Sequence, residues 1–485
     1  MRRAIRLHAA VALALAPALA LAPALALAGL RPAPGGTATI ALPGEARTGD
    51  PARAEDPADL VLARATSAPL LERDPQGRLA PAVLAEIPSS EDGGRTWRLR
   101  LREGIATAAG SPVGAAELAA VVSRLLSPFS PHAWAALPIA GADEVLAGRA
   151  AAPAGLRVLS GSEVELALAF PLPELPELLA ALPLAVPRAG PFEGAAPRSG
   201  APLLLRANAN APTGRPFLDA LALRAADGRA AARLLAQGQV DLVLRPESAG
   251  GTAGPALPAV RVVVAALGAG LASGAGARVR QALASLDRAA LARRFVRGAA
   301  VPLDTLVPPA LLAGASHPAA ASPLAPRDGG AAPVRVRILV RRDGADPRAI
   351  ADRLQVTLFD RGVSAAVEAV ERERFAARLA AGDYELALVE VHVLGTRPAL
   401  AAGQLAYATR GAAAARRAMK ALAGLGGDAA AAAAERLGRE LDLVPLVATA
   451  PRASVSPRLQ GIAPGPEGLV DPAALWRPGG AASAP

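Results

Sequence analysis

Hydrophobic and polar residues alternate with a period of two in residues 95–104, RTWRLRLREG. One face of this stretch carries arginines, and the other is apolar, with Trp97, Leu99 and Leu101. Such alternation predicts a half-buried strand with an arginine-lined outer face. The next stretch, residues 111–128, has the pattern of a helix, in which we expect Ser111 to be the N-cap and Pro112 the first helical residue.

Two other segments, one before and one after these stretches, also predict β-structure. Residues 35–42, GGTATIAL, indicate a first strand, because Thr, Ile and Leu favour β-structure. Residues 158–170 indicate a hairpin with its turn at Gly161. The Pro- and Gly-containing loop at residues 246–258 predicts a crossing between domains.

The second half of the chain has the most regular pattern. A buried strand at residues 261–270 precedes a long helix, residues 276–298, with an apolar stripe and a closing glycine. Strand-like and helix-like segments then alternate from residue 334 to residue 391, and the first of these helices opens at Asp346. This alternation predicts a parallel or mixed α/β sheet. Two alanine-rich helices follow, the second capped by Asp428.

The composition fits a folded protein of two or three domains. The chain has 485 residues, of which 52% are hydrophobic and only 2% aromatic, so its core must be built from Leu, Val and Ala. The formal net charge of +10 comes almost wholly from arginine, because Lys420 is the only lysine. Arginines alternate with acidic residues, as on solvated helix faces, which argues against a nucleic-acid-binding protein.

The N-terminus has the order of a secretory signal peptide. Arginines precede an Ala/Leu run, residues 9–28, which ends in an Ala-Leu-Ala cleavage site. The alternative is an uncleaved membrane anchor, since about twenty apolar residues suffice for a span. Pro17 and Pro23 interrupt the run, so we expect cleavage after Ala28 and export to the periplasm or another extracytoplasmic space. The chain has no cysteine, hence no disulfide and no thiol to carry a lipid anchor.

No pattern indicates catalysis, a metal site or a cofactor. Gly268, Gly270 and Gly274 follow a strand, but their spacing is one residue too long for a dinucleotide-binding loop. No H-E-x-x-H metal motif and no G-x-S-x-G nucleophile elbow occur. The histidines beyond the signal segment are far apart in the chain: His132, His317 and His392. A secreted hydrolase is therefore a weak alternative, because it would lack an identifiable acid, base and nucleophile.

Several motifs, in the same order along the chain, resemble the extracytoplasmic solute-binding proteins of ABC importers, specifically the peptide/nickel-binding family (family 5). That family has an Asp-Gly turn, an aromatic-containing strand ending in Leu-Arg-x-Gly, and a helix start with Ala-Glu. The corresponding residues here are Asp92-Gly93, Trp97 to Gly104, and Ala116-Glu117. Further matches cover nearly the whole chain after the signal segment, at residues 35–42, 70–87, 278–309 and 350–388.

The resemblance implies an α/β, two-lobed periplasmic-binding-protein fold, type II-like, with a small extra subdomain inserted in the first lobe. Residues 1–28 would be the signal peptide, residues 29–255 with 452–485 the first lobe, residues 67–189 the inserted subdomain, and residues 256–451 the second lobe. A ligand would bind in the cleft between the lobes and stabilise the closed form.

The function implied by the resemblance is the substrate-binding component of an ABC transporter, without catalysis. A monomer would capture a small solute, peptide-class or related, and deliver it to permease subunits in the membrane. The alternative is a solute-sensing or scaffold protein on the same fold without a permease partner.

One segment departs from the family pattern and bears on the ligand. After the DYELAL strand, where peptide binders usually have a Trp and an Asp-rich loop, this chain reads VEVHVLGTRPALAAG. The acidic residue that would anchor a peptide's α-ammonium is missing there, which favours an anionic or hydrogen-bonding solute. The residues we expect to contact the ligand are Thr66, Trp134, Arg245, His392, Thr396 and Arg397.

Overall fold

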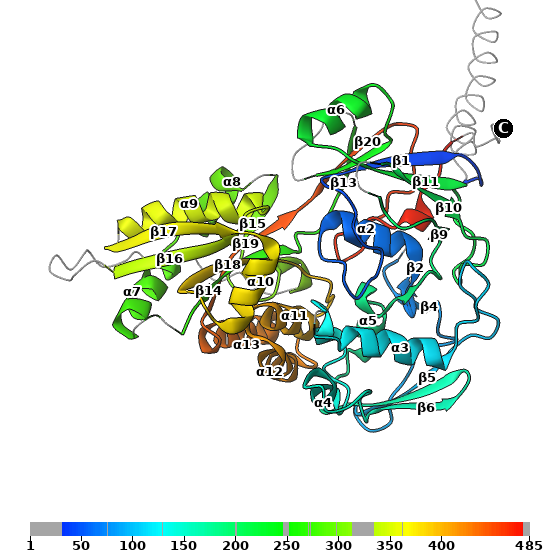
Figure 1. Cartoon of the computed structure of the whole chain (residues 1–485), viewed down its shortest axis with the longest axis horizontal. Coiled ribbons are helices and arrows are strands. Elements are labelled where there is room, and N and C mark those ends of the chain that lie inside the picture. Colours follow the sequence, from blue (N-terminus) through cyan, green and yellow to red (C-terminus); the bar gives the residue numbers. More distant parts are fainter. Residues whose placement is uncertain are drawn as a thin grey trace, which may run out of the picture.

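The computed structural model describes residues 32–478, apart from residues 75, 129, 199–200, 246–251, 270, 272, 297, 313–333 and 361. The expected signal peptide therefore lies outside the described residues. Two large sheets lie side by side, and a small three-stranded sheet lies next to the first (Figure 1). No helix within the described part of the chain is long and apolar enough to cross a membrane.

The first large sheet has seven strands with a parallel centre. There, β1 (Thr37–Leu42) pairs in parallel with β11 (Ala220–Ala225) and β12 (Leu242–Arg245), which confirms the predicted first strand. Antiparallel strands extend both edges: β10 (Leu203–Ala207) and β9 (Phe192–Glu193) on one side, β20 (Arg452–Val455) and β13 (Thr252–Ala256) on the other. One face packs against α2 (Pro57–Thr66) and the other against α6 (Gly228–Ala236).

The second large sheet has six strands in the order β15–β19–β14–β18–β16–β17. Their bounds, in that order, are Ala299–Pro302, Leu443–Ala450, Arg261–Leu267, Leu386–His392, Val334–Arg341 and Val363–Val370. Because β16 is parallel to both β17 and β18, the mixed α/β sheet predicted from the alternation is confirmed.

Helices cover both faces of this second sheet (Figure 1). One layer holds α7 (Ser273–Ala284), α8 (Arg288–Phe295) and α9 (Ala345–Phe359). The other layer holds α10 (Arg372–Ala381), α11 (Pro398–Arg410), α12 (Ala412–Leu422) and α13 (Gly427–Glu440). Val263 of β14 packs in the core below α7, α8 and α9, and Val262 packs in the core below the other helix layer. Strand β14 is therefore buried on both faces.

The small sheet contains β5 (Thr96–Arg100), β7 (Glu163–Ala167) and β6 (Leu156–Ser160). Trp97, Leu99 and Leu101 are buried and the arginines between them are exposed, as the period of two predicts. The hairpin around Gly161 is also confirmed, by the antiparallel pairing of β6 with β7. Helix α3 (Ala115–Leu125) packs into the same core.

Short elements complete this part of the chain. The paired strands are β2 (Ser67–Ala68) with β8 (Val186–Pro187), and β3 (Leu71–Arg73) with β4 (Leu79–Pro81). The short helices are η1 (Ala133–Ala135), α4 (Ala142–Leu146), α5 (Leu175–Leu179) and η2 (Leu182–Leu184).

Four predicted helix starts or spans were wrong in detail. Helix α9 begins at Ala345, after the N-cap Gly344, so Asp346 lies in its first turn and does not open it. Helix α3 begins at Ala115, after Gly114, because the Glu117 carboxylate accepts the Gly114 N–H in place of a cap by Ser111. The helix predicted over residues 276–298 is two helices, since the Asp287 side chain accepts the Ala290 N–H and starts α8. The last helix has Gly426 as its N-cap, so Asp428 lies in its first turn.

The chain crosses between the two large sheets at two adjacent places. Strand β13 leads through residues 257–260 into β14, and β19 leads through Pro451 into β20. The crossings run antiparallel to each other, because Ala256 pairs with Arg452 and Arg261 pairs with Thr449. Two short neighbouring connections of this kind can act as a hinge.

Candidate functional site

Three neighbouring strands of the second sheet end in polar residues at one edge. Arg341 ends β16, Arg372 follows β17, and His392 ends β18. The carboxyl ends of parallel strands are where open α/β sheets bind ligands. The loop after β1 brings Glu55 and Asp56 to this edge from the first sheet. We call the region bordered by these five residues the junction.

Asp56 is the main charge contact across the junction. It occupies the N-cap position of α2, yet its side chain makes no capping bond there. Instead its carboxylate accepts a hydrogen bond from Arg372, which begins α10, and lies 3.5 Å from Arg341, which ends β16 of the second sheet. Arg372 also donates to Glu55 over 3.2 Å. A capping position is therefore used to hold the two sheets together.

Asp56 and Arg341 also have partners on their own sides of the junction. Asp56 accepts from Arg47, which precedes it in the same loop. Arg341 donates to Asp343 over 2.7 and 2.9 Å, two residues further along the chain. Hydrogen bonding to Arg341 lowers the pKa of Asp343 against the effect of its partial burial.

A second charge contact lies beside the small sheet. The buried carboxylate of Glu177, in α5, accepts from Arg73 of β3 and from Arg397, the residue before α11. Arg73 also donates to the Thr396 hydroxyl over 3.0 Å. Thr396 and Arg397, which we expected to face a ligand, are thus engaged with residues of the small-sheet region.

Two histidines at the junction each have an unused hydrogen-bond acceptor. His132 Nε2 lies 2.6 Å from the Ala54 carbonyl and His392 Nε2 lies 2.7 Å from the Glu467 carbonyl. A carbonyl oxygen can only accept, so each Nε2 carries the proton and each Nδ1 is an acceptor. Both Nδ1 atoms are buried and have no partner. Burial lowers the pKa of both rings to about 4, and the charges of Arg261 and His132 contribute to the lowered pKa of His392.

An apolar contact accompanies these polar groups. Trp134, in η1, is fully buried in the core of the small sheet. Four residues from the part of the chain that forms the second large sheet and its helices belong to the same core: Leu394, Leu400, Ala415 and Met419. Its indole N–H has no hydrogen-bond partner. Tyr407 of α11 donates to the Ser130 carbonyl over 3.2 Å, next to this contact. The expected ligand residue Trp134 therefore packs between α11, α12 and the small-sheet region.

A partly buried ion pair lies two residues before His392 within the second sheet. Glu390 of β18 accepts a hydrogen bond from Arg261 of β14, the strand beside it. Burial raises the pKa of Glu390, and the nearby Arg261 opposes that rise. Burial likewise raises the pKa of Glu55 at the junction, while Arg372 lowers it.

Two expected ligand residues remain, Thr66 and Arg245. Thr66 donates its hydroxyl to the Leu62 carbonyl, 2.9 Å away at the end of α2. Arg245 ends β12, and its side chain lies outside the described part of the structure. The sequence reasoning missed Asp56, Glu177, Arg341 and Arg372. Only the two arginines had a signal, their place at the carboxyl ends of predicted strands.

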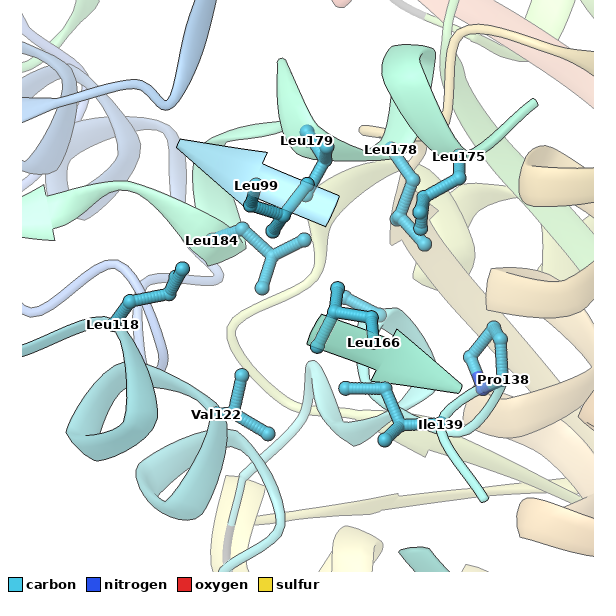
Figure 2. A pocket seen from close by; sticks show the side chains of 11 residues that line it. Leu99, Leu118, Val122, Pro138, Ile139, Leu166, Leu175, Leu178, Leu179 and Leu184 are labelled. Carbon is cyan, nitrogen blue, oxygen red and sulfur yellow. The ribbon is translucent and has the colours of Figure 1, made fainter. Parts of the chain in front are cut away.

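Two cavities occur near the small sheet, and neither lies between the large sheets. One is an apolar void of about 10 Å³, in which Leu99, Leu166 and Leu184 point inward (Figure 2). It has room for about one water but no polar group to hold it, so it is a packing gap in the core. The other is an open depression of about 590 Å³, formed mainly by residues 102–117 and 158–162. The described residues contain no group of three or more potential metal ligands.

Comparisons with known proteins agree with this architecture. Residues 78–401 match the sequence profile described as bacterial extracellular solute-binding proteins, family 5 Middle. No curated protein sequence matches the chain. Several solved structures share the fold over 91% of this chain. Haemophilus influenzae OppA in complex with RPPGFSPFR aligns with a TM-score of 0.73, 16% identity and 99% coverage of OppA.

Two further structures are similar over the same share of this chain. The Escherichia coli murein tripeptide binding protein MppA aligns with a TM-score of 0.73, 18% identity and 98% coverage of MppA. NikA from Brucella suis in complex with Fe(III)-EDTA aligns with a TM-score of 0.70, 16% identity and 100% coverage of NikA. At these identities the structures establish a mixed α/β binding-protein fold and do not identify a ligand.

Proposed function

The chain belongs to family 5 of the bacterial extracellular solute-binding proteins, and on that basis we propose that it captures a small solute at the junction and delivers it to an ABC permease. Members of this family are binding components of ABC transporters, so the role of the chain is binding and not catalysis. The solute class and the permease partner are the proposed part.

The proposed moving parts are two lobes. The first comprises residues 29–255 and 452–485, with residues 67–189 as a subdomain, and the second comprises residues 256–451. This division is supported by the two adjacent chain crossings at residues 257–260 and 451, which are the connections a hinge requires. Contacts from both lobes meet at the junction, so a ligand bound there would stabilise the closed form.

The observation that carries the proposal is the pair of unused acceptors on His132 and His392. A buried acceptor without a donor costs free energy, and a solute N–H or O–H would relieve that cost. The two rings come from opposite lobes, so one solute that reaches both would join them. We therefore propose a hydrogen-bond-donating solute. That solute would not be anchored by a free α-amino group, because the loop after β18 supplies no carboxylate and the carboxylates of Glu55, Asp56 and Glu390 are already paired with arginines.

We further propose that residues 1–28 are removed on export and that the mature chain works as a monomer outside the cytoplasmic membrane, without a lipid anchor. This placement is supported by family membership and by the signal-like N-terminus. The structures of relatives in complex with RPPGFSPFR and with Fe(III)-EDTA motivate testing both peptides and metal chelates.

A thermal-shift screen of the purified chain tests the proposal. The panel would include free and N-acetylated oligopeptides, amino acids, polyols and metal chelates. A true ligand at about 100 times its Kd adds about 2.7 kcal/mol to stability, which appears as a raised melting temperature. His132→Ala and His392→Ala should each weaken that shift, whereas Glu144→Gln, which alters a surface pair with Arg149, should leave it unchanged.

Two outcomes would contradict the proposal. One is a screen in which no solute raises the melting temperature. The other is a ligand that binds both histidine variants as tightly as the unaltered chain. Micromolar binding of a free peptide that is lost on N-acetylation would overturn the solute class.

A further inference from the structure

Two carboxylates, Asp56 and Glu177, are each shared between arginines of both lobes. Asp56 accepts from Arg47 of its own lobe and pairs with Arg341 and Arg372 of the other. Glu177 accepts from Arg73 on its own side and from Arg397 on the opposite side. The same arrangement therefore occurs twice, at separate points along the boundary between the lobes.

We propose that these two shared carboxylates form a latch that holds the lobes closed before any solute binds. The latch consists of Asp56 and Glu177 with the arginines of the second lobe, Arg341, Arg372 and Arg397. The inference rests on the proposed function, because it assumes that the lobes move about the hinge.

Own-lobe partners make this latch easy to release. Removing one member of a buried ion pair is strongly destabilising when the other charge is left buried and unpaired. On opening, however, Asp56 keeps Arg47, and Glu177 keeps Arg73. Arg341 keeps Asp343, and Arg372 lies 3.8 Å from the same carboxylate. Four of the five partners thus retain a counter-ion in both states: Asp56, Glu177, Arg341 and Arg372. The fifth, Arg397, is 54% exposed and is solvated by water on opening, and opening also frees Asp56 to cap α2.

Other described contacts across the boundary also stabilise the closed form, but their carboxylates do not pair with arginines of both lobes. Arg416 of α12 pairs with Asp143, and the Gly424 N–H donates to Glu174 over 2.5 Å. The apolar contact of Trp134 with Leu400 and Met419 favours closure as well. Among the described ion pairs, only the carboxylates of Asp56 and Glu177 pair with an arginine of their own lobe and also with an arginine of the opposite lobe. They are therefore the groups that set the balance between closed and open forms.

The exposure of the arginines makes the latch sensitive to salt. The side chain of Arg372 is 19% exposed and that of Arg397 is 54% exposed. Salt screens partly exposed pairs much more than buried ones. The closed fraction of the solute-free protein should therefore fall as ionic strength rises, and the solute would then meet a partly closed receptor.

Distance measurements on the solute-free chain test the latch. The chain contains no cysteine, so Leu204→Cys in β10 and Val356→Cys in α9 would carry the only two spin labels. Both positions are about half exposed and lie in opposite lobes. We expect a short distance to dominate at low salt. Asp56→Asn with Glu177→Gln should lower the closed-to-open ratio about threefold to tenfold.

The substitutions are chosen to keep the fold. Asn caps a helix as well as Asp does, and Gln has the size of Glu, so each removes charge and little else. Arg372→Gln should produce a smaller shift in the same direction from the other side of the boundary. Asp352→Asn, which alters a pair with Arg348 inside α9, is the matched control and should leave the distances unchanged.

Added sodium chloride should shift the unaltered chain towards the long distance and affect the double variant less. Identical distance distributions for the unaltered chain and the double variant would overturn the latch. So would a solute-free chain that is fully open at low salt. Because no solute is present, these outcomes bear on the latch alone, while the solute screen bears on the proposed function.

Discussion

Trp134 offers the sharpest test of how the boundary between the lobes is packed. The side chain is fully buried against α11 and α12, and its indole N–H has no partner. A buried Trp removes about 200 Å² from water, which corresponds to about 5 kcal/mol. Leaving the N–H unpaired offsets about 1–3 kcal/mol of that. We therefore expect Trp134→Ala to lower the free energy of unfolding by about 3 kcal/mol.

Trp134→Phe separates the two contributions. Phenylalanine keeps most of the apolar contact and has no N–H to satisfy, so the loss should stay below about 1.5 kcal/mol. Urea unfolding followed by far-ultraviolet circular dichroism would measure both variants. Arg98→Ala, on the exposed face of β5, is the control and should change stability by less than about 0.5 kcal/mol.

Two results would refute this reasoning. If Trp134→Ala left the unfolding midpoint unchanged but abolished solute binding, the indole would be a ligand platform and not a packing residue. If Trp134→Phe cost as much as Trp134→Ala, the indole N–H would have a partner that the contacts described here do not include.

Three further predictions follow from named residues. Trp97→Ala should cost about 3–5 kcal/mol of stability, measured by urea unfolding, because Trp97 is buried in the same core; unchanged unfolding would contradict this. Burial lowers the folded-state pKa of His132 to about 4, below its usual 6.5. The buried neutral ring therefore contributes fully to the free energy of unfolding above pH 6.5, and this contribution is lost as the pH falls towards 4. Between pH 6.5 and pH 4 the free energy of unfolding should fall by about 3 kcal/mol more in the unaltered chain than in His132→Asn. Parallel plots of stability against pH for the two proteins would contradict this. The intact mass of the exported protein should lack residues 1–28, and a full-length chain embedded in the membrane would contradict cleavage.

Local patterns predicted the parts of the fold that local burial determines. The strand alternation at Trp97 and the parallel strands between residues 334 and 391 follow from which side chains must leave water, and both were confirmed. The break at Asp287 was missed, because the apolar stripe continues through it at helical spacing. A cap formed by one side chain changes the chain direction without changing that pattern.

The site was harder to predict, because its contacts join residues far apart in the chain. Asp56 and Arg372 are 316 residues apart, and Glu177 and Arg397 are 220 apart. Asp56 precedes a helix-starting proline, so in the sequence it looks like an ordinary N-cap. Its use as a cross-lobe partner depends on how the two large sheets meet, which no local pattern records.

Hydrogen exchange with a solute from the screen tests the central claim most directly. The account predicts that bound solute slows exchange on both sides of the junction, in residues 47–56 and 130–136 of the first lobe and in residues 390–397 of the second. Solute should leave exchange unchanged in residues 102–117, which form part of the open depression away from the junction. Protection confined to one lobe, or found only at that depression, would contradict the claim that this protein holds its solute between two lobes.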